Sequence, residues 1–306
     1  MRNAFAKEIT FQASKRDDIV LLSGDIGNRM FDNFKAIAPD RFINCGIAEA
    51  NMMSIASGLA LCGLRPIVYT ITPFTTTRCL EQIKVGAAYH QASIVIVGTG
   101  SGLSYSELGP THHSLEDMAI LRSIPGIRIQ APTDSFELEM QLKEAINIQG
   151  PTYIRIGKKG ETLLHKNHEK IGISSGQMLI EGKDAIILGI GPIVEEAIKA
   201  SKELKTIGID IAVASLGGIV PLDDKFLKDI SQRNYKNWIT LEEHNIIGGL
   251  GSTILEWMND YNLCKDIRLH RLGAPNKFIH EIGNQEYTRN LIGINKDGII
   301  KYIRDL

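Results

Sequence analysis

The chain has 306 residues, of which 43 % are hydrophobic and 23 % are charged, a balance typical of a soluble globular enzyme and a length sufficient for two domains. Its formal net charge of −1 gives no electrostatic reason to expect nucleic acid or anionic lipid as a partner. No apolar run approaches the ~20 residues that a membrane helix needs, and the first twenty residues lack the apolar centre of a secretory signal. The four cysteines show no CxxC spacing and lie in apolar segments, which predicts reduced core thiols in a cytoplasmic protein and no metal site: Cys45, Cys62, Cys79 and Cys264.

Strand and helix patterns alternate through the first half of the chain. Near-continuous apolar runs predict strands that are buried on both faces. The predicted strands are 19–22, 41–45, 66–69, 93–97, 127–129 and 153–156, and the predicted helices are 3–14, 50–61, 77–89, 114–122 and 135–148. Such alternation is typical of a parallel sheet with helices on both faces, and it predicts a first domain over residues 1–156.

A polar, glycine-rich stretch over residues 157–177 then predicts a linker, and a second α/β unit follows over 178–306. Its predicted strands are 185–189, 209–214, 238–242 and 267–272, and its predicted helices are 193–204, 225–231, 252–259 and 297–304. The sequence therefore predicts the α/β class, with two consecutive domains that each contain a mostly parallel sheet covered by helices on both faces.

Glu49 is the most informative residue of the chain, because it is an acid at a strand-to-helix turn surrounded by apolar neighbours. It could be an ordinary first-turn acid that the helix dipole favours. Alternatively, burial among Ile47, Met52, Met53 and Ile55 would raise the pKa of its carboxyl, so that it could share a proton with a ring nitrogen.

Paired histidines form a second candidate site. His112 and His113 lie in a turn before a predicted helix and follow the glycine-rich loop 98–102. Ligands bind at strand ends in parallel sheets, and imidazoles transfer protons near neutral pH. The alternative is that one histidine caps the helix and the other is a solvated loop residue.

Two further features have both functional and structural interpretations. Phe74 follows a strand and could stack on a flat ring, although a core phenylalanine is the default interpretation. The glycines of segment 241–252 permit close backbone approach at a helix start and could receive an anion, or they could serve packing alone. Their spacing is not that of a dinucleotide fingerprint.

Four stretches together resemble the C-terminal half of a transketolase, in the version encoded as a separate subunit. They are GIAEANMMSIASGLALCG, GPTHHSLEDMAILRSIPGI, GPTYIRIGK and LEEHNIIGGLGS, and the resemblance covers almost the whole chain in the right order. It implies a pyrimidine-binding domain over 1–156, which binds the aminopyrimidine ring of thiamine diphosphate, and a transketolase C-terminal domain over 178–306, which helps to form a homodimer contact.

The resemblance also implies roles for individual residues. Glu49 matches the glutamate that protonates the aminopyrimidine, Phe74 a cofactor-stacking aromatic, and Asp25 an acid of the cofactor site near the subunit interface. His112 and His113 match substrate-facing histidines, with His112 catalytic. Arg155 falls where the family places a basic residue that faces the substrate phosphate. The alternative is a surface or inter-domain salt bridge.

One family motif is absent. Thiamine diphosphate enzymes hold Mg²⁺ and the diphosphate with a Gly-Asp-Gly motif and a later asparagine. Gly24-Asp25-Ile26 with Asn51 has a similar spacing, but it lacks the second glycine. We therefore expect a separate N-terminal subunit to hold the metal and diphosphate, in an α2β2 assembly, and no metal ligand in this chain.

Three departures from the family pattern concern the substrate. Leu108 stands where many transketolases carry an aspartate that contacts a sugar hydroxyl. A further family histidine falls near Gly100, and a second aromatic expected beside the pyrimidine falls near Leu80. These losses predict ketol transfer with an altered sugar. The alternatives are the β subunit of a 2-oxo acid dehydrogenase, a 1-deoxyxylulose 5-phosphate synthase-like enzyme, and a catalytically silent scaffold subunit.

Overall fold

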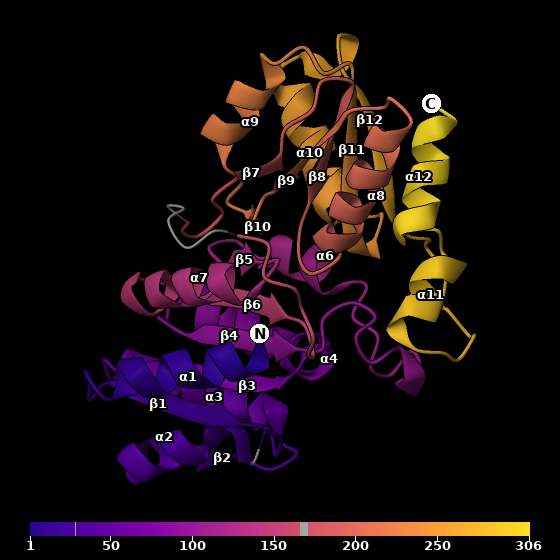
Figure 1. Cartoon of the computed structure of the whole chain (residues 1–306). Helices are drawn as coiled ribbons and strands as arrows, with labels where there is room; N and C mark the ends of the chain where they lie inside the picture. Colours follow the sequence, from indigo (N-terminus) through magenta and orange to yellow (C-terminus); the bar gives the residue numbers. More distant parts are fainter. Residues whose placement is uncertain (28, 166–170) are drawn as a thin grey trace.

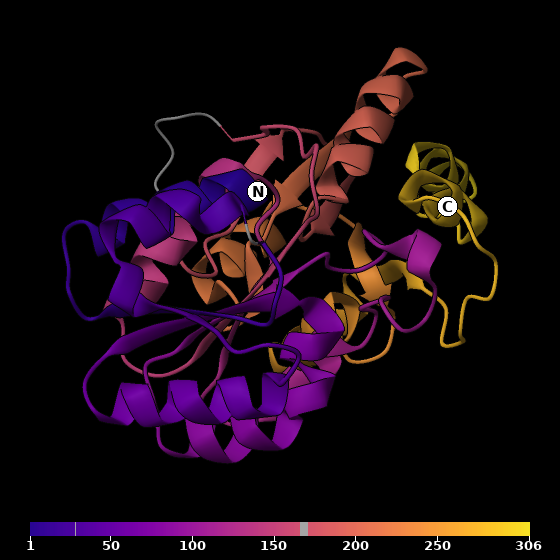
Figure 2. The same ribbon diagram turned by 90° about the horizontal axis from the view of Figure 1, so that it is seen from below.

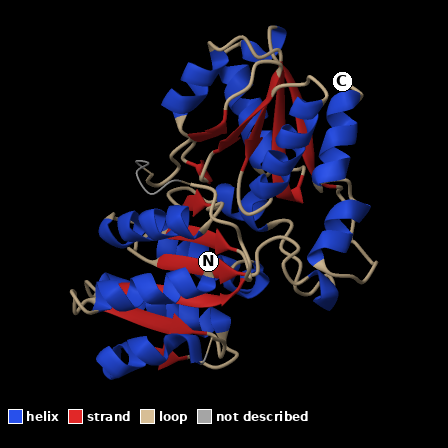
Figure 3. Ribbon diagram, in the orientation of Figure 1, coloured by secondary structure: helices blue, strands red, loops and turns tan. Residues whose placement is uncertain are grey.

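The computed structural model describes residues 1–27, 29–165 and 171–306, and this part of the chain forms two stacked α/β units (Figure 1). The first sheet has seven strands in the order β10-β5-β6-β4-β3-β1-β2, and the second has five in the order β12-β11-β8-β9-β7, counted over the described residues. Both appear as separate layers in Figure 3. The expected α/β class, with two mostly parallel sheets, is confirmed.

The strands of the first sheet, apart from β10, come from the first half of the chain. They are β1 (Ile19–Ser23), β2 (Phe42–Asn44), β3 (Arg65–Ile71), β4 (Val95–Thr99), β5 (Arg128–Gln130) and β6 (Thr152–Ile156). All pairs among them are parallel. Successive residues point to opposite faces, so that Ile67 packs on one side of the sheet and Val68 on the other. Burial of both faces explains the near-continuous apolar runs.

Helices cover both faces of this sheet, as Figure 2 shows. Helices α1 (Arg2–Ala13) and α7 (Ser135–Asn147) pack on one face through residues such as Phe5 and Leu138. Helices α3 (Glu49–Leu61), η4 (Ile83–Tyr89) and α6 (Asp117–Arg122) pack on the other through residues such as Met52. The short helix α2 (Asp32–Ile37) lies outside the sequence prediction, because six residues carry too little periodicity.

The predicted helix 77–89 is wrong as one continuous element. The structure divides the region into α4 (Thr72–Thr75), η3 (Thr77–Cys79), α5 (Leu80–Gln82) and the π-helix η4. The hydroxyls of Thr75, Thr76 and Thr77 donate to the carbonyls of Thr72 and Pro73, so these bonds accompany the break between α4 and η3. Phe74 and Arg78 flank this break.

The second sheet contains β7 (Gln177–Ile180), β8 (Ala185–Gly189), β9 (Ile211–Ser215), β11 (Asn237–Asn245) and β12 (Arg268–Ala274). Only β7 pairs antiparallel within it, over the described residues. Its helices are α8 (Val194–Thr206), α9 (Asp224–Ser231), α10 (Leu250–Asp260), α11 (Gln285–Leu291) and α12 (Lys296–Arg304). Helices α8 and α12 cover one face, and α9 and α10 cover the other.

A strand from the second half of the chain completes the first sheet. β10 (Gly218–Val220) pairs antiparallel with β5, and the apolar cluster beneath it contains residues of both units. Gln130, which is fully buried, donates to the Val220 carbonyl (3.2 Å) and to Ser174 Oγ (2.8 Å), and its own Oε1 accepts from the Ser174 N–H (2.6 Å). The two units are therefore joined by backbone pairing as well as by apolar packing.

The expected linker 157–177 includes residues 166–170, which lie outside the described residues. Around this gap, Ser174 is hydrogen-bonded to Gln130, and strand β7 begins at Gln177.

Of the cysteines, Cys79 is buried and Cys45 is half-buried, but Cys62 and Cys264 are exposed. The expectation of four core thiols is wrong for these two, because their apolar neighbours point inward while they do not. None of the helices in the described ranges is long and apolar enough to cross a membrane.

Replacing Gln130 with alanine is expected to weaken the joint between the two units. The Ser174 N–H and the Val220 carbonyl would lose their buried partner, at a cost of about 2–4 kcal/mol in the free energy of unfolding. Urea unfolding of the Gln130→Ala chain measures this loss. Gln149→Ala, at an exposed position, is the matched control and should change stability by less than about 0.5 kcal/mol. Equal stability of the two variants would contradict the role of Gln130.

Candidate active site

The predicted site residues Glu49, Phe74 and His112 meet at the carboxyl-terminal edge of the first sheet. Glu49 is the first residue of α3 and follows β2, Phe74 lies in α4 directly after β3, and His112 lies in the loop after β4. Parallel strands all end at the same edge of a sheet, so three segments far apart in sequence deliver side chains to one place.

Glu49 lies deep in this site, with 3 % of its surface exposed. Its Oε1 accepts a hydrogen bond of 2.8 Å from Arg78 Nη1. Met52 and Met53 are fully buried, as expected, but Ile47 is 80 % exposed and does not wall the acid. Ile47 precedes the helix and points outward, so the expected apolar enclosure on that side is wrong.

Phe74 and His112 form the opposite side of the site. Their ring centroids are 5.3 Å apart in an edge-to-face arrangement, and both side chains are half-buried. Burial, the positive charge of Arg78 and the neighbouring His113 together lower the pKa of His112. Its imidazole is therefore neutral at pH 7 and can accept a proton. Nδ1 lies 2.9 Å from Thr111 Oγ1, which orients the ring.

His113 does not stand beside His112 in the same environment. It is 5 % exposed, and its Nε2 donates to the Ser106 carbonyl over 3.2 Å. It also lines a cavity of about 420 Å³ on the side of Asn276 and Phe278. His113 is therefore buried against the loop that contains Ser106, and a contact with substrate stays a prediction.

Arg155 is buried at the boundary between the two units. Its guanidinium is buried, with Nε 2.9 Å from Asp117 Oδ2 and Nη2 donating to the Ser114 carbonyl at 3.0 Å. Burial opposes the charge, but Asp117 raises the pKa of Arg155 above its usual value. Nη2 also reaches the Glu243 carbonyl of the second unit at 3.4 Å. These contacts are those of an internal salt bridge at the domain boundary, the alternative named above, and a role toward the substrate phosphate stays a prediction.

Asp25 lies at the end of β1, exposed and in the left-handed region with φ 57°. Its Oδ1 accepts from Asn44 Nδ2 at 2.9 Å, and a contact with cofactor stays a prediction. Asn51 is exposed on α3. Within the described ranges, no group of three or more His, Cys, Asp or Glu side chains could hold a metal ion.

The glycine-rich segment 241–252 has a structural use. Glu242 Oε2 accepts from the Leu250 N–H at 2.7 Å and Oε1 from the Gly251 N–H at 2.9 Å, so a side chain of the same segment fills the start of α10. Burial raises the pKa of Glu242 to about 7. A Cβ on Gly249 would lie 2.0 Å from Glu242 Oε2, which explains the glycine. The anion at the N-terminus of α10 is therefore the carboxylate of Glu242.

Sequence reasoning missed three residues of the site: Arg78, Tyr105 and Lys158. A Cβ on Gly100 would lie 2.0 Å from Tyr105 Cε2, so the Tyr105 ring occupies the space that a side chain at position 100 would need. This ring meets His112 edge to face at 6.1 Å, and Lys158 Nζ lies 4.4 Å from its centroid. The usable signals were the glycine-rich loop before Tyr105 and the end of β6 before Lys158.

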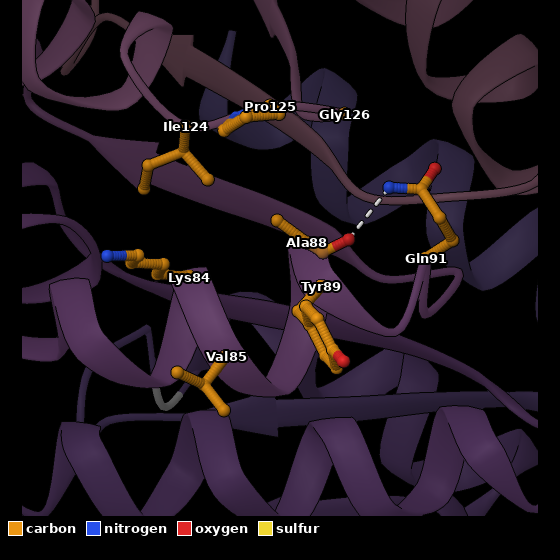
Figure 4. Close-up of a pocket in the computed structure, with 8 residues that line it drawn as sticks. All are labelled: Lys84, Val85, Ala88, Tyr89, Gln91, Ile124, Pro125 and Gly126. Atoms are coloured by element: carbon orange, nitrogen blue, oxygen red, sulfur yellow. Dashed lines mark hydrogen bonds between the residues drawn. The ribbon is translucent and has the colours of Figure 1, made fainter.

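A larger cavity of about 620 Å³ lies away from this chemistry (Figure 4). It is lined by η4 and by the segment before β5, including Lys84, Tyr89 and Pro125. Both segments precede a strand, so the cavity opens at the amino-terminal edge of the sheet, opposite Glu49. Its lining carries a single charged side chain, that of Lys84, and we assign it no catalytic part.

Comparison with known families agrees with this architecture. Residues 1–160 match the transketolase pyrimidine-binding domain, and residues 174–299 match the transketolase C-terminal domain. The chain belongs to the transketolase family.

Three relatives define its place there. An apulose-4-phosphate transketolase subunit of Phocaeicola vulgatus is 30 % identical over 98 % of this chain and 95 % of its own length. A solved structure described as a split gene transketolase, inactive beta4 tetramer, has a TM-score of 0.88 at 28 % identity and covers 99 % of this chain and 96 % of that one. The 1-deoxy-D-xylulose-5-phosphate synthase of Aquifex aeolicus is 33 % identical over 99 % of this chain but only 48 % of its own length.

This chain covers nearly the whole length of the two transketolase relatives but only about half of the synthase, so it corresponds to a split transketolase subunit. This chain is the C-terminal subunit of a split transketolase, a transferase of ketol groups, and such a subunit implies a separate partner subunit.

Replacing Arg155 with glutamine is expected to destabilise the chain by about 3–5 kcal/mol, because Asp117 would be left as an unpaired buried charge. Urea unfolding measures the loss. Lys158→Gln is the matched control: Lys158 pairs with Glu107 at the surface, and its loss should cost at most about 1 kcal/mol. A stable Arg155→Gln chain whose assembled enzyme had only a raised KM would support the substrate role.

Proposed function

We propose that the carboxyl-terminal edge of the first sheet holds the aminopyrimidine half of thiamine diphosphate, and that the separate N-terminal subunit holds its diphosphate and Mg²⁺. The observation that carries this proposal is the pairing of a buried acid with an aromatic face. The flat guanidinium of Arg78 bonds to Glu49 and lies over the Phe74 ring, with Cζ 4.0 Å from the centroid. The space between Glu49 and Phe74 thus accepts one planar group that stacks on the aromatic ring and hydrogen-bonds to the acid, and an aminopyrimidine is such a group.

When bound, the cofactor supplies a nucleophilic thiazolium carbon that takes up the two-carbon unit. The residues of this chain contribute the rest. Glu49 exchanges a proton with the ring nitrogen, because its carboxylate lies inside the site, within reach of a planar group placed on Phe74. Phe74 fixes the plane of the ring. His112, neutral at pH 7, exchanges a proton with a substrate hydroxyl, and the exposed Asp25 contributes to the cofactor site near the subunit interface.

We propose an α2β2 assembly with a homodimer contact between two copies of this chain. The segment Gly24-Asp25-Ile26, which lacks the second glycine of the Gly-Asp-Gly motif, supports an obligate partner, as does the solved relative that is described as an inactive beta4 tetramer. We further propose a sugar other than the usual pentose phosphates. Gly100 and Leu108 lack hydrogen-bonding groups at the substrate side, and one relative is named for apulose 4-phosphate. The cytoplasmic location remains a prediction.

The lone chain should bind thiamine diphosphate with Mg²⁺ very weakly or not at all, because the charged end of the cofactor lacks its anchor. Isothermal titration compares the lone chain with the complex reconstituted with the N-terminal subunit, which should bind at micromolar concentration or below. Micromolar affinity of the lone chain would refute the partner requirement. Pyruvate turnover with CO2 release, in place of ketol transfer, would favour the synthase alternative.

Replacing Glu49 with glutamine should lower the kcat of the complex by a factor of about 10²–10⁴, because the amide cannot exchange the proton. Steady-state ketol-transfer kinetics measure the effect. Glu81→Gln, an exposed acid on α5, is the matched control and should keep the kcat of the native complex. Unchanged turnover of Glu49→Gln would support the scaffold alternative.

A further inference from the structure

Arg78 has an unusual position for an exposed arginine. It lies in η3, four residues after Phe74, and 45 % of its side chain is exposed. Even so, its guanidinium makes two specific contacts at the centre of the site: Nη1 donates to Glu49 Oε1 at 2.8 Å, and Cζ stands 4.0 Å from the Phe74 ring centroid. The planar head of Arg78 thus lies between the acid and the ring, although much of the side chain is open to solvent.

Glu49 accounts for the first contact. A carboxylate that is 3 % exposed and has no partner is strongly disfavoured. Among the described residues, Arg78 is the side chain that hydrogen-bonds it. Phe74 accounts for the second contact, because a guanidinium is weakly hydrated and stacks well on an aromatic face. The two contacts together place one flat, hydrogen-bond-donating cation in a defined plane.

These contacts are the same two that the proposed function assigns to the aminopyrimidine, and the inference rests on that function. A separation of 4.0 Å is a single layer of van der Waals contact, which leaves no room for a second planar group between Arg78 and Phe74. The two planar groups therefore exclude each other.

We propose that the Arg78 guanidinium occupies the aminopyrimidine position in the cofactor-free chain, and that it must leave this position when the cofactor enters. In this role Arg78 is a placeholder: it satisfies the acid and covers the ring until cofactor and partner arrive. The exchange needs no opening of the core, because the Arg78 side chain is almost half exposed and can rotate into solvent. Glu49 then exchanges its hydrogen bond from Arg78 for one shared with the ring nitrogen.

The proposal makes cofactor affinity the decisive measurement, since each binding event must first displace Arg78. Arg78→Gln removes both the cation–π contact and the ion pair. In the complex reconstituted with the N-terminal subunit and Mg²⁺, the Kd for thiamine diphosphate should fall roughly tenfold, as measured by isothermal titration. An unchanged or raised Kd would overturn the proposal, and a raised one would mean that Arg78 holds the bound cofactor.

Arg16→Gln is the matched control. Arg16 is also a partly exposed arginine paired with an acid, Asp18, but it lies before β1 at the amino-terminal edge of the sheet. Its loss should leave the Kd unchanged. A native complex that binds no thiamine diphosphate would refute the proposed function itself, which keeps the two failures distinct.

A second measurement does not depend on a variant that folds. Structures of the native complex solved with and without thiamine diphosphate should show Arg78 on Glu49 only in the cofactor-free state. An aminopyrimidine bound between Glu49 and Phe74 while Arg78 keeps both of its contacts would overturn the proposal.

Discussion

A carboxylate withdrawn from water must have a partner, and in this chain the active-site edge is built around that requirement at Glu49. The parallel sheet brings the acid, the Phe74 ring and His112 to one edge, because every strand ends there. Burial makes this carboxylate costly to leave without a partner. Arg78 is the partner of Glu49 in the isolated subunit. Its guanidinium is flat, like the aminopyrimidine ring that we propose takes its place.

Buried charge also joins the two units. Asp117 and Arg155 form an ion pair inside the protein, and Arg155 reaches backbone carbonyls on both sides of the boundary. Glu243 extends the same junction: it accepts the Leu103 N–H from the active-site loop and pairs with Arg289 of α11. The loop that carries His112 is therefore held by the second unit, so this unit contributes to the site without supplying a predicted catalytic group.

The fold was largely predictable because buried strands leave an unmistakable pattern. Apolar runs such as that of β4 indicate a strand buried on both faces, and Glu49 stands out because most of its neighbours in the sequence are apolar. Arg155 shows the limit of this approach: position in sequence placed a cation near the strand end, but only packing decides whether it faces a cavity or Asp117. The region after Phe74 shows another limit, since periodicity predicts one helix over 77–89 and the structure has η3, α5 and the π-helix η4 there.

The pairing of β10 with β5 has a consequence for how the molecule can be divided. A strand from residues 218–220 closes one side of a sheet whose other members all come from residues before 157. A fragment that stopped after β6 would leave the β5 backbone open to solvent, ready to template an intruding strand from another molecule. The amino-terminal unit is thus sealed by a later part of the chain, and a newly made polypeptide completes this unit only after a good part of its successor has been synthesised.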